Sequence, residues 1–326
     1  MNRSPLFRTL VAMVAVVALA MPALAAKNDA LSLVPANAVT VGMVKLADMR
    51  TSPLSSLLFE HTDRMSTDGE AERFLSEAGL SPTKDVDVLV VATTPRTNLG
   101  TEADVLVIAE GRFNAERLSA ALVTRGAVSK GGYLVLPKDK SDNDENGAVA
   151  FPTPSLAIAG NERSVIAALA ARAAGGTGFA ARGTLGQDLA RLDSNATAWA
   201  LVDVTRAARL TKSGTIGTNK GAPGEMLQTA LRTVSTIGVW AKDKGNALEL
   251  GAFGLSTDDE TLQLLEDTVR GGLSALRLAV KDKAPEMVTV IRAFDVSRNK
   301  DAVLIEGSIP ASQLRELMAK KSASKN

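Results

Sequence analysis

The sequence predicts an α+β protein made of two tandem repeats, each an antiparallel sheet of ferredoxin-like β-α-β-β-α-β order with extra strands and a terminal helix. Two observations lead to this prediction. Similar segments recur in both halves of the chain, and β-rich runs alternate with helical stripes in the same order in each half. The chain has 326 residues, which is long enough for two domains.

The internal similarity is clearest at two places. Residues Asn37–Val44 (NAVTVGMV) align without gaps with Asn195–Val202 (NATAWALV), 158 residues later. Residues Ser155–Gly160 (SLAIAG) align with Ala302–Gly307 (AVLIEG), 147 residues later. The identity is low, but the order of elements agrees, and this indicates a duplication.

The first repeat is expected to cover residues 26–174. Asn114 is placed to cap a helix, with Phe113 and Leu118 at the positions of a hydrophobic staple, and Asn161 is placed to cap a later helix. Strands are predicted where β-branched and apolar residues alternate or cluster. The expected elements are strand 39–46, helix 53–80 in two pieces, strands 86–92 and 104–109, helix 115–124, strands 133–136, 148–151 and 156–159, and a helix ending near 174.

The second repeat is expected to cover residues 194–326, after a glycine-rich linker at 175–193. Thr257–Glu260 (TDDE) fits a capping box at the start of a long amphipathic helix. Gly271 and Gly272 inside that helix cost about 1 kcal/mol each relative to alanine, so we expect a neighbouring element to approach them closely or the helix to kink there. The expected elements are strand 197–203, helix 225–232, strands 235–241 and 248–253, helix 258–281, strands 287–291 and 302–307, and a final helix from Ala311.

Residues 1–25 have the layout of a secretory signal peptide. Arg3 and Arg8 precede an apolar run at 10–20, and Ala23-Leu24-Ala25 forms an A-x-A cleavage site. The run is shorter than the roughly 20 apolar residues of a membrane-spanning helix, which argues against an uncleaved anchor. Cleavage near Ala25 would place the mature protein in the periplasm or outside the cell.

Composition excludes several classes of function. Cleavage removes two of the 37 Lys and Arg residues and none of the 36 Asp and Glu residues, so the mature chain has 35 against 36 and a net charge of −1. A neutral surface gives no electrostatic reason to bind nucleic acid, and aromatic residues, at 3%, are too few for base-stacking platforms. The chain has no cysteine, so neither a disulfide nor a lipid-modified cysteine is possible.

Three short segments resemble stretches of exported bacterial proteins of unknown function. They are Val34–Ala38 (VPANA), Arg50–Leu54 (RTSPL) and Arg270–Leu273 (RGGL). The resemblance implies a signal peptide followed by tandem α/β domains over most of the mature chain. It implies no catalytic residues.

Ser141–Gly147 (SDNDENG) contains the first half of an EF-hand calcium loop. Asp142, Asp144 and Asn146 stand on alternate positions before a glycine, as calcium-ligating oxygens do in that loop. The twelfth position should be a bidentate glutamate, and here it is Thr153. Calcium binding by Asp142, Asp144 and Asn146 is therefore the weaker of two interpretations of this segment.

The other reading of this segment is a solvated hairpin turn, because Asn-Gly is a strong two-residue hairpin signal. The segment that we match to it in the second half is Asp295–Ala302 (DVSRNKDA). It carries Arg298 and Lys300 where a calcium site would need carboxylates. The comparison favours a polar turn in both halves.

Two other patterns suggest catalysis but stand in the wrong context. Ser81–Lys84, Ser141–Asn143 and Lys212–Gly214 follow the order of the S-x-x-K, S-D-N and K-T-G signatures of serine β-lactamases. Lys84, however, leads into a predicted strand, whereas the mechanism needs the serine to open a helix. His61 is the only histidine, and it borders the apolar stripe of its predicted helix, so a site with several histidine ligands is impossible within one chain.

These patterns lead us to expect an exported, non-enzymatic protein without a cofactor that binds an envelope protein or ligand. One alternative is a carrier of an apolar small molecule or lipid in a cleft between the repeats. Another is a hydrolase with a serine and carboxylate site assembled across the duplication. The sequence does not indicate an oligomeric state.

Overall fold

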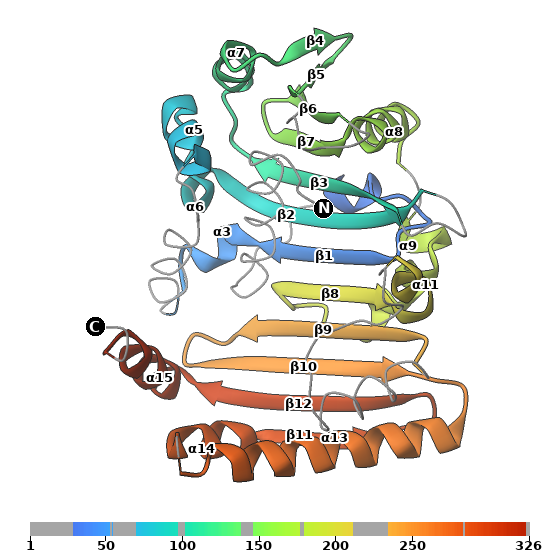
Figure 1. The fold of residues 1–326 in the computed structure, drawn as a ribbon, viewed down its shortest axis with the longest axis vertical. Coiled ribbons are helices and arrows are strands. Elements are labelled where there is room, and N and C mark those ends of the chain that lie inside the picture. Colours follow the sequence, from blue (N-terminus) through green and yellow to red (C-terminus); the bar gives the residue numbers. More distant parts are fainter. Residues whose placement is uncertain are drawn as a thin grey trace.

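The computed structural model describes residues 29–52, 54, 70–96, 102–137, 146–176, 179–210, 234–282 and 284–323. Their strands join into a single antiparallel sheet (Figure 1). The strands are β1 (Thr40–Lys45), β2 (Val86–Pro95), β3 (Ala103–Gly111), β4 (Val128–Lys130), β5 (Tyr133–Val135), β6 (Gly147–Thr153), β7 (Leu156–Asn161), β8 (Ala198–Asp203), β9 (Thr236–Asp243), β10 (Ala247–Leu255), β11 (Phe294–Arg298) and β12 (Ala302–Pro310). The order of the 12 strands is β11-β12-β10-β9-β8-β1-β2-β3-β7-β6-β5-β4.

The α+β class is confirmed, but the prediction of two separate sheets is wrong. Strand β1 pairs with β8, with Gly42 opposite Ala200, and this pair joins both halves of the chain into one sheet. The strand order also differs from the ferredoxin-like order, which places another strand between the first two. Here β1, β2 and β3 are consecutive antiparallel neighbours.

The two halves of the sheet follow the same path outward from the β1–β8 pair. One half runs β1-β2-β3-β7-β6, and the other runs β8-β9-β10-β12-β11. Strands β5 and β4 extend only the first half. The two ends of the sheet therefore differ in structure.

Helices cover both faces of the sheet. They are α2 (Asp29–Ser32), α3 (Leu46–Met49), α5 (Glu70–Ala78), α6 (Pro82–Asp85), α7 (Ala115–Thr124), α8 (Glu162–Ala173), α9 (Phe179–Arg182), α10 (Thr184–Asp188), the 3₁₀ turn η1 (Leu189–Arg191), α11 (Val204–Arg209), α13 (Asp259–Val280), α14 (Pro285–Arg292) and α15 (Ala311–Ala323). In Figure 1, α13 crosses in front of β11 at one end of the sheet, and α7 lies near β4 and β5 at the other. No described helix is both long and apolar enough to cross a membrane.

The core has one layer on each face of the sheet. On the first face, which we call the α8 face, Val165 of α8 and Leu185 of α10 are buried in one cluster with strand residues such as Leu106. On the opposite face, which we call the α13 face, α7 packs Leu118 against the strands, and α13 packs Leu262 there. Each fully buried leucine contributes roughly 1.5–3 kcal/mol, so these contacts hold the helices in place.

Local signals placed several helices correctly. Helix α7 begins where predicted, and the Asn114 side chain accepts a hydrogen bond from the Arg117 N–H at 2.9 Å. Helix α13 is capped by Asp258, one residue after the predicted Thr257, and Asp258 accepts from the Thr261 N–H at 2.8 Å. Such a cap contributes about 1 kcal/mol because it satisfies a free N–H of the first turn.

Asn161 occupies the N-cap position of α8 but does not cap it. Its side-chain oxygen instead accepts a hydrogen bond from the Val105 N–H on the neighbouring strand β3 at 2.7 Å. The position of the helix start was predicted correctly, and the role of the side chain was not. The asparagine ties the end of β7 to β3.

Two predictions of secondary structure are wrong. Residues 287–291 form part of α14, because Pro285 suits the first turn of a helix and the segment packs on α13. Residues 295–298, taken as a turn, belong to β11. The proposed linker 175–193 contains α9, α10 and η1, which pack against the sheet through buried Phe179 and Leu185. The predicted helix 225–232 lies outside the described residues.

The polar segment Ser141–Gly147 belongs to the connection from β5 to β6, and these two strands pair with each other. Gly147 is the first residue of β6, so Asn146-Gly147 is not the predicted two-residue turn. The match of this segment to Asp295–Ala302 is also wrong. That second segment contains β11 and the turn into β12, so it corresponds by position to the β6–β7 connection. The second half therefore gives no test of the calcium interpretation.

Gly271 and Gly272 do not face a neighbouring element, contrary to our expectation. A Cβ atom built on either residue would meet no described atom within 4 Å. Gly251 is different, since its Cβ would lie 2.2 Å from Cε2 of Trp240. The two helix glycines therefore weaken α13 without any gain from close packing.

We predict that Gly271→Ala and Gly272→Ala each stabilise the protein by up to about 1 kcal/mol, because alanine favours the helix and restricts the unfolded chain. Urea unfolding of the mature protein measures this free energy. Gly251→Ala is the matched control and should destabilise it. Unchanged or reduced stability of both helix variants would contradict the prediction.

Candidate functional site

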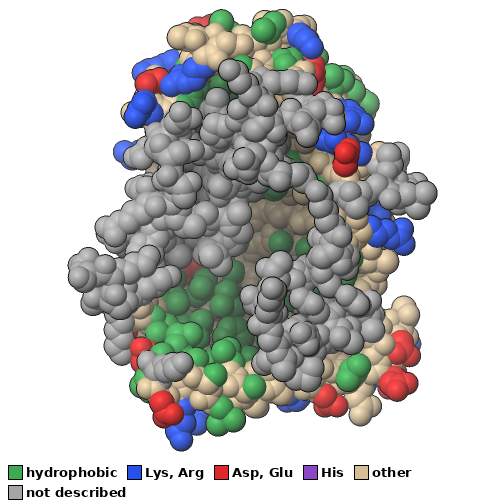
Figure 2. All heavy atoms as spheres, viewed as in Figure 1, with side chains coloured by type: hydrophobic (Ala, Val, Ile, Leu, Met, Phe, Trp, Pro, Cys, Tyr) green, Lys and Arg blue, Asp and Glu red, His purple; other side chains and the backbone are tan. Residues whose placement is uncertain are grey.

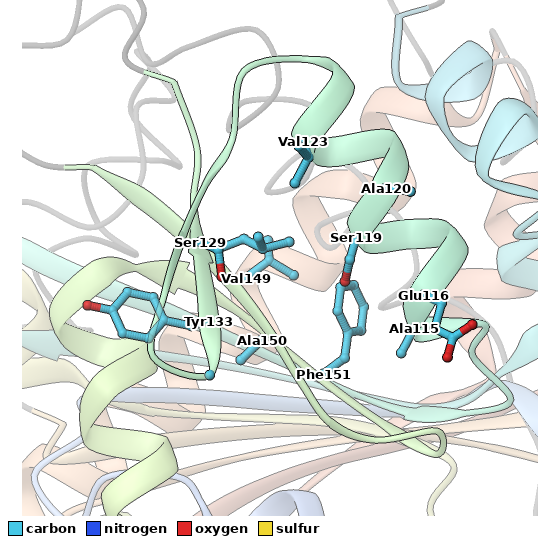
Figure 3. Close-up of a pocket in the computed structure, with 12 residues that line it drawn as sticks. Ala115, Glu116, Ser119, Ala120, Val123, Ser129, Tyr133, Val149, Ala150 and Phe151 are labelled. Atoms are coloured by element: carbon cyan, nitrogen blue, oxygen red, sulfur yellow. The ribbon is translucent and has the colours of Figure 1, made fainter.

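An open groove of about 510 Å³ lies between helix α7 and the strands at one end of the sheet. Figure 3 shows α7 on one side of the groove and the strands β4, β5 and β6 on the other. Its volume falls within the range of ordinary ligand pockets, roughly 300–1,000 Å³. The α7 side is lined by Ala115, Glu116, Ser119, Ala120 and Val123.

Helix α7 presents this wall because its other side is anchored in the core. Leu118 and Leu122, one turn apart, are buried against the sheet. Ser119 and Val123 lie on the adjoining side and face the groove, and Ala120 lies at its rim. Val123 is 51% exposed, which leaves part of the apolar groove wall uncovered.

The opposite wall is a tight hairpin. Gly131 and Gly132 join β4 to β5 and have φ angles of +47° and +101°, which glycine adopts at little cost. Lys130 pairs with Tyr133 across this turn. Strand β4 was not predicted from the sequence, although two glycines between short apolar runs are a hairpin signal.

The floor of the groove continues the sheet. Ser129 of β4 lies opposite Leu134 of β5, and Leu134 lies opposite Val149 of β6, so all three point to the α13 face. Phe151 adds an aromatic ring beside α7 (Figure 3). The floor is apolar apart from the serine hydroxyl, which suits an apolar side chain.

Few polar groups reach the groove. Ser119 and Ser129 supply hydroxyls, and Glu116 supplies a carboxylate on the exposed side of α7. Glu116 forms no ion pair with any other residue that the structure describes. This composition, apolar with a few polar groups, is typical of ligand-binding pockets.

A cluster of polar side chains holds the hairpin from the α8 face. The Glu162 carboxylate accepts hydrogen bonds from Lys130 Nζ at 2.9 Å, from the Tyr133 hydroxyl at 2.9 Å and from Asn146 Nδ2 at 3.1 Å. The bond from Lys130, followed by those from Asn146 and Tyr133, holds the pKa of Glu162 below its usual value. Figure 3 shows the Tyr133 hydroxyl directed away from the groove. We call these four residues the Glu162 clasp.

The structure leaves the calcium prediction open. Asp142 and Asp144 lie outside the described residues. Asn146 is described, and its amide nitrogen is held by Glu162. Across the described residues, no group of three or more His, Cys, Asp or Glu side chains is placed to hold a metal ion. Calcium at Asp142, Asp144 and Asn146 therefore stays a prediction.

Charged residues gather where the two halves of the sheet meet. Lys45 ends β1, and Asp48 follows in α3. Asp193 precedes β8, and its carboxylate is 2.6 Å from Lys242 Nζ on β9. Burial lowers the pKa of Lys45, against the attraction of Asp48 and Asp193. This cluster links the halves through charge as well as through the sheet.

Asp48 is the least satisfied member of this cluster. It is 2% exposed, and its Oδ2 atom has no hydrogen-bond partner. Burial raises the pKa of Asp48 to about 6, against the opposing charge of Lys45. An ionised carboxylate with an unpaired buried oxygen is costly, so the fold shifts the equilibrium of Asp48 toward its neutral form.

The hydrolase alternative required a serine and a carboxylate assembled from both halves, and one such pair is present. Ser52 Oγ donates to Asp243 Oδ2, and Ser52 Oγ also accepts from the Leu54 N–H at 3.0 Å. Both side chains are buried, and Asp243 also accepts from the Gly245 N–H. The pair ties α3 to the end of β9, and no enzymatic site is evident among the described residues.

The other catalytic candidates are not brought together by the described residues. Ser81 stands at the N-cap position of α6, which is only four residues long and leads directly into β2. The segments Ser141–Asn143 and Lys212–Gly214 lie outside the described residues, and so does His61. The S-x-x-K pattern therefore opens a single helical turn rather than a catalytic helix.

Asp48 makes stability depend on pH. Because its folded pKa of about 6 exceeds the reference value of 3.8, the folded protein holds this proton more tightly than the unfolded chain does. The contribution of this proton to the free energy of unfolding is fully present below the unfolded pKa and is lost as pH rises through about 6. We predict a loss of roughly 2 kcal/mol of unfolding free energy between pH 4 and pH 7 from this group.

Asp48→Asn tests this prediction, because asparagine keeps the shape and removes the titration. The variant should match the wild type near pH 4 and exceed its stability near pH 7.5, as measured by urea unfolding across pH. Asp295→Asn, at an exposed position of β11, is the control. Equal pH profiles for wild type and Asp48→Asn would refute the prediction.

Comparison with known proteins places the chain in no family. No protein family model matches it, and no curated protein sequence is a significant relative. Among solved structures, it is similar to TP0453 of Treponema pallidum. Crystal form I of that protein gives a TM-score of 0.47 at 9% identity, covering 89% of this chain and 96% of TP0453. Crystal form III gives 0.48 at 10% identity, covering 89% and 97%.

Proposed function

We propose that this is an exported, non-enzymatic protein that binds another protein of the cell envelope through the groove between α7 and β4–β6. The signal-peptide pattern of residues 1–25 supports export to the periplasm or the exterior. The observation that carries the binding role is the groove itself, an apolar cavity of about 510 Å³ with few polar groups.

The composition of the groove favours binding over catalysis. Its polar groups are two serine hydroxyls and the carboxylate of Glu116. Neither hydroxyl forms a hydrogen bond with a base among the described residues, and nucleophilic catalysis by serine needs such a bond. Large exposed apolar side chains such as Val123 are, by contrast, common at protein-binding surfaces.

We also propose that the chain arose by duplication of one α+β unit. The shared strand order of the two halves supports this. So does the register of β1 with β8, since Gly42 lies opposite Ala200, which is its own counterpart at the spacing of 158 residues. The cross-strand row that contains Gly42 reaches Ala159 in β7, and the row that contains Ala200 reaches Ile305 in β12. Ala159 and Ile305 are therefore counterparts, so the predicted offset of 147 residues in that strand is one residue too long.

Ala120→Trp tests the binding role. Ala120 is exposed at the rim of the groove, so the larger tryptophan side chain should cover the groove without disturbing the core. Ala167→Trp is the matched control, because Ala167 is an exposed position of a helix, α8, away from the groove. Tagged mature protein is used to capture partners from envelope extract, with identification by mass spectrometry.

We predict that one or more proteins bind the wild type and Ala167→Trp but are lost with Ala120→Trp, because the indole takes the place of the partner's side chain. Thermal unfolding confirms that both variants are folded. The proposed role fails if Ala120→Trp captures the same proteins in the same amounts as the wild type.

A second candidate function is favoured by one specific observation on the α13 face. Val239, in the central strand β9, is 44% exposed, and it lies in one cross-strand row with Ala252, Ala200, Gly42 and Val91. Figure 2 shows hydrophobic side chains exposed within a hollow on this side of the molecule. Such an apolar floor, located where the halves meet, supports a carrier of an apolar small molecule or lipid.

The apolar dye ANS tests the carrier role, since its fluorescence rises on apolar surfaces. A charge at Val239 should weaken dye binding ~10-fold, because the lysine ammonium must be desolvated in the floor. The variants are Val239→Lys and, as a control, Val128→Lys on the exposed edge strand β4. Equal dye binding by both variants and the wild type would exclude the carrier site.

A further inference from the structure

We propose that the occupant of the groove is an extended polypeptide segment of a partner protein, which pairs with β4 as an additional strand and places one apolar side chain between α7 and the sheet. This inference rests on the proposed binding function and specifies its ligand. It follows from the backbone of β4, from the side chains around it and from the charges nearby.

The backbone of β4 offers a free hydrogen-bonding edge. Strand β4 is the last strand of the sheet, and its only described partner is β5. Lys130 and Tyr133 close a two-residue turn and are therefore a hydrogen-bonded pair. The next pair, Ser129 and Leu134, is then a non-hydrogen-bonded pair, so the N–H and C=O of Ser129 point away from β5.

A hydrogen bond between β5 and β6 confirms this alternation of hydrogen-bonded and non-hydrogen-bonded pairs. The Leu136 N–H donates to the Gly147 carbonyl on β6 at 2.8 Å. Leu134, two residues earlier, therefore also directs its backbone groups toward β6, as the assignment for Ser129 requires. The outward groups of Ser129 have no hydrogen-bond partner among the described residues outside the sheet. An added strand would satisfy both groups, which is the mode of recognition called β-augmentation.

The side chains of such a strand would alternate between the two faces. A residue opposite Ser129 would share the row of Ser129, Leu134 and Val149, and would therefore point into the groove beside α7. Its neighbours would point to the other face, beside Val128. Val123 is 51% exposed on the groove side, and Val128 is 61% exposed on the other. An added strand would cover both valines, which explains their exposure at one edge.

Charge completes the description of the partner. Glu116 lines the groove and has no ion-pair partner among the described residues, so it favours a basic residue in the bound segment. Lys130 does not repel such a residue, because Glu162 holds its ammonium at 2.9 Å. The expected ligand is therefore an extended segment with alternating apolar residues and one lysine or arginine.

The experiment uses a phage-displayed library of random peptides selected on the mature wild-type protein, and the affinity of a selected synthetic peptide for each variant. Ser129→Pro removes the outward N–H and leaves the β5 bonds intact, because proline is tolerated on edge strands. Ser129→Ala removes only the hydroxyl and is the matched control. Ala120→Trp blocks the groove. Circular dichroism and thermal unfolding confirm that each variant is folded.

We expect selected peptides to be rich in β-branched residues and to carry a basic residue. Their affinity should fall ~10-fold or more with Ser129→Pro, stay within ~2-fold with Ser129→Ala, and fall with Ala120→Trp, since a backbone hydrogen bond and the groove contact are lost in turn. Peptides that lose affinity only with Ala120→Trp would overturn strand addition and leave the proposed function standing. Peptides insensitive to all three variants would overturn both.

The oligomeric state provides an independent outcome. If the wild type sediments as a dimer at micromolar concentration and Ser129→Pro sediments as a monomer, the edge of β4 is occupied by a second copy of this chain. That result would overturn the assignment of a different partner protein. A monomeric wild type that binds the peptide supports it.

Discussion

The pairing of β1 with β8 is the interaction on which the rest of the structure depends. It joins residues 40–44 to residues 198–202 in an unbroken antiparallel ladder, and so turns two sets of strands into one sheet with two continuous faces. Without it, each half would present a long apolar edge in the middle of the molecule, with unpaired backbone groups that invite aggregation. Among the described strands, the pairing leaves two edges, β11 and β4, at the far ends of the sheet. The strand edges that the structure describes are therefore at its two ends.

The two ends differ because the same position in each half is filled differently. Between the third strand and the outer strands, the second half inserts α13 and α14, whereas the first half inserts α7 and the β4–β5 hairpin. Helix α13 has 22 residues, and its leucines pack with Val296 and Val303 of the outer strands β11 and β12. Helix α7 has 10 residues and buries two leucines. The shorter helix leaves space beside the outer strands, and that space is the groove.

The strands of the central sheet could be predicted because their apolar runs are local signals in the sequence. The groove could not be predicted because it depends on contacts between residues that are distant in the sequence. The run at 287–291 is β-branched and was predicted as a strand, but Pro285 and packing on α13 make it a helix. Strand β4 has three exposed residues and no alternation, so only its Gly-Gly turn could have indicated it. The joining of the two halves into one sheet was not predictable from periodicity. The apolar pattern of a strand reports that it is buried, but it does not report which strands lie beside it.

The Glu162 clasp explains why the groove exists before any partner binds. A hairpin of two three-residue strands is not stable alone, so its position depends on contacts with the rest of the protein. Lys130 and Tyr133, the residues that flank its turn, are both held by Glu162, which belongs to the helix on the opposite face of the sheet. The hairpin is thereby held toward α8 and away from α7, while Leu134 keeps it registered on β6. Because the groove is already formed, binding does not include the entropic cost of ordering its wall. A short segment can therefore bind with higher affinity than it would if the wall had to be ordered on binding.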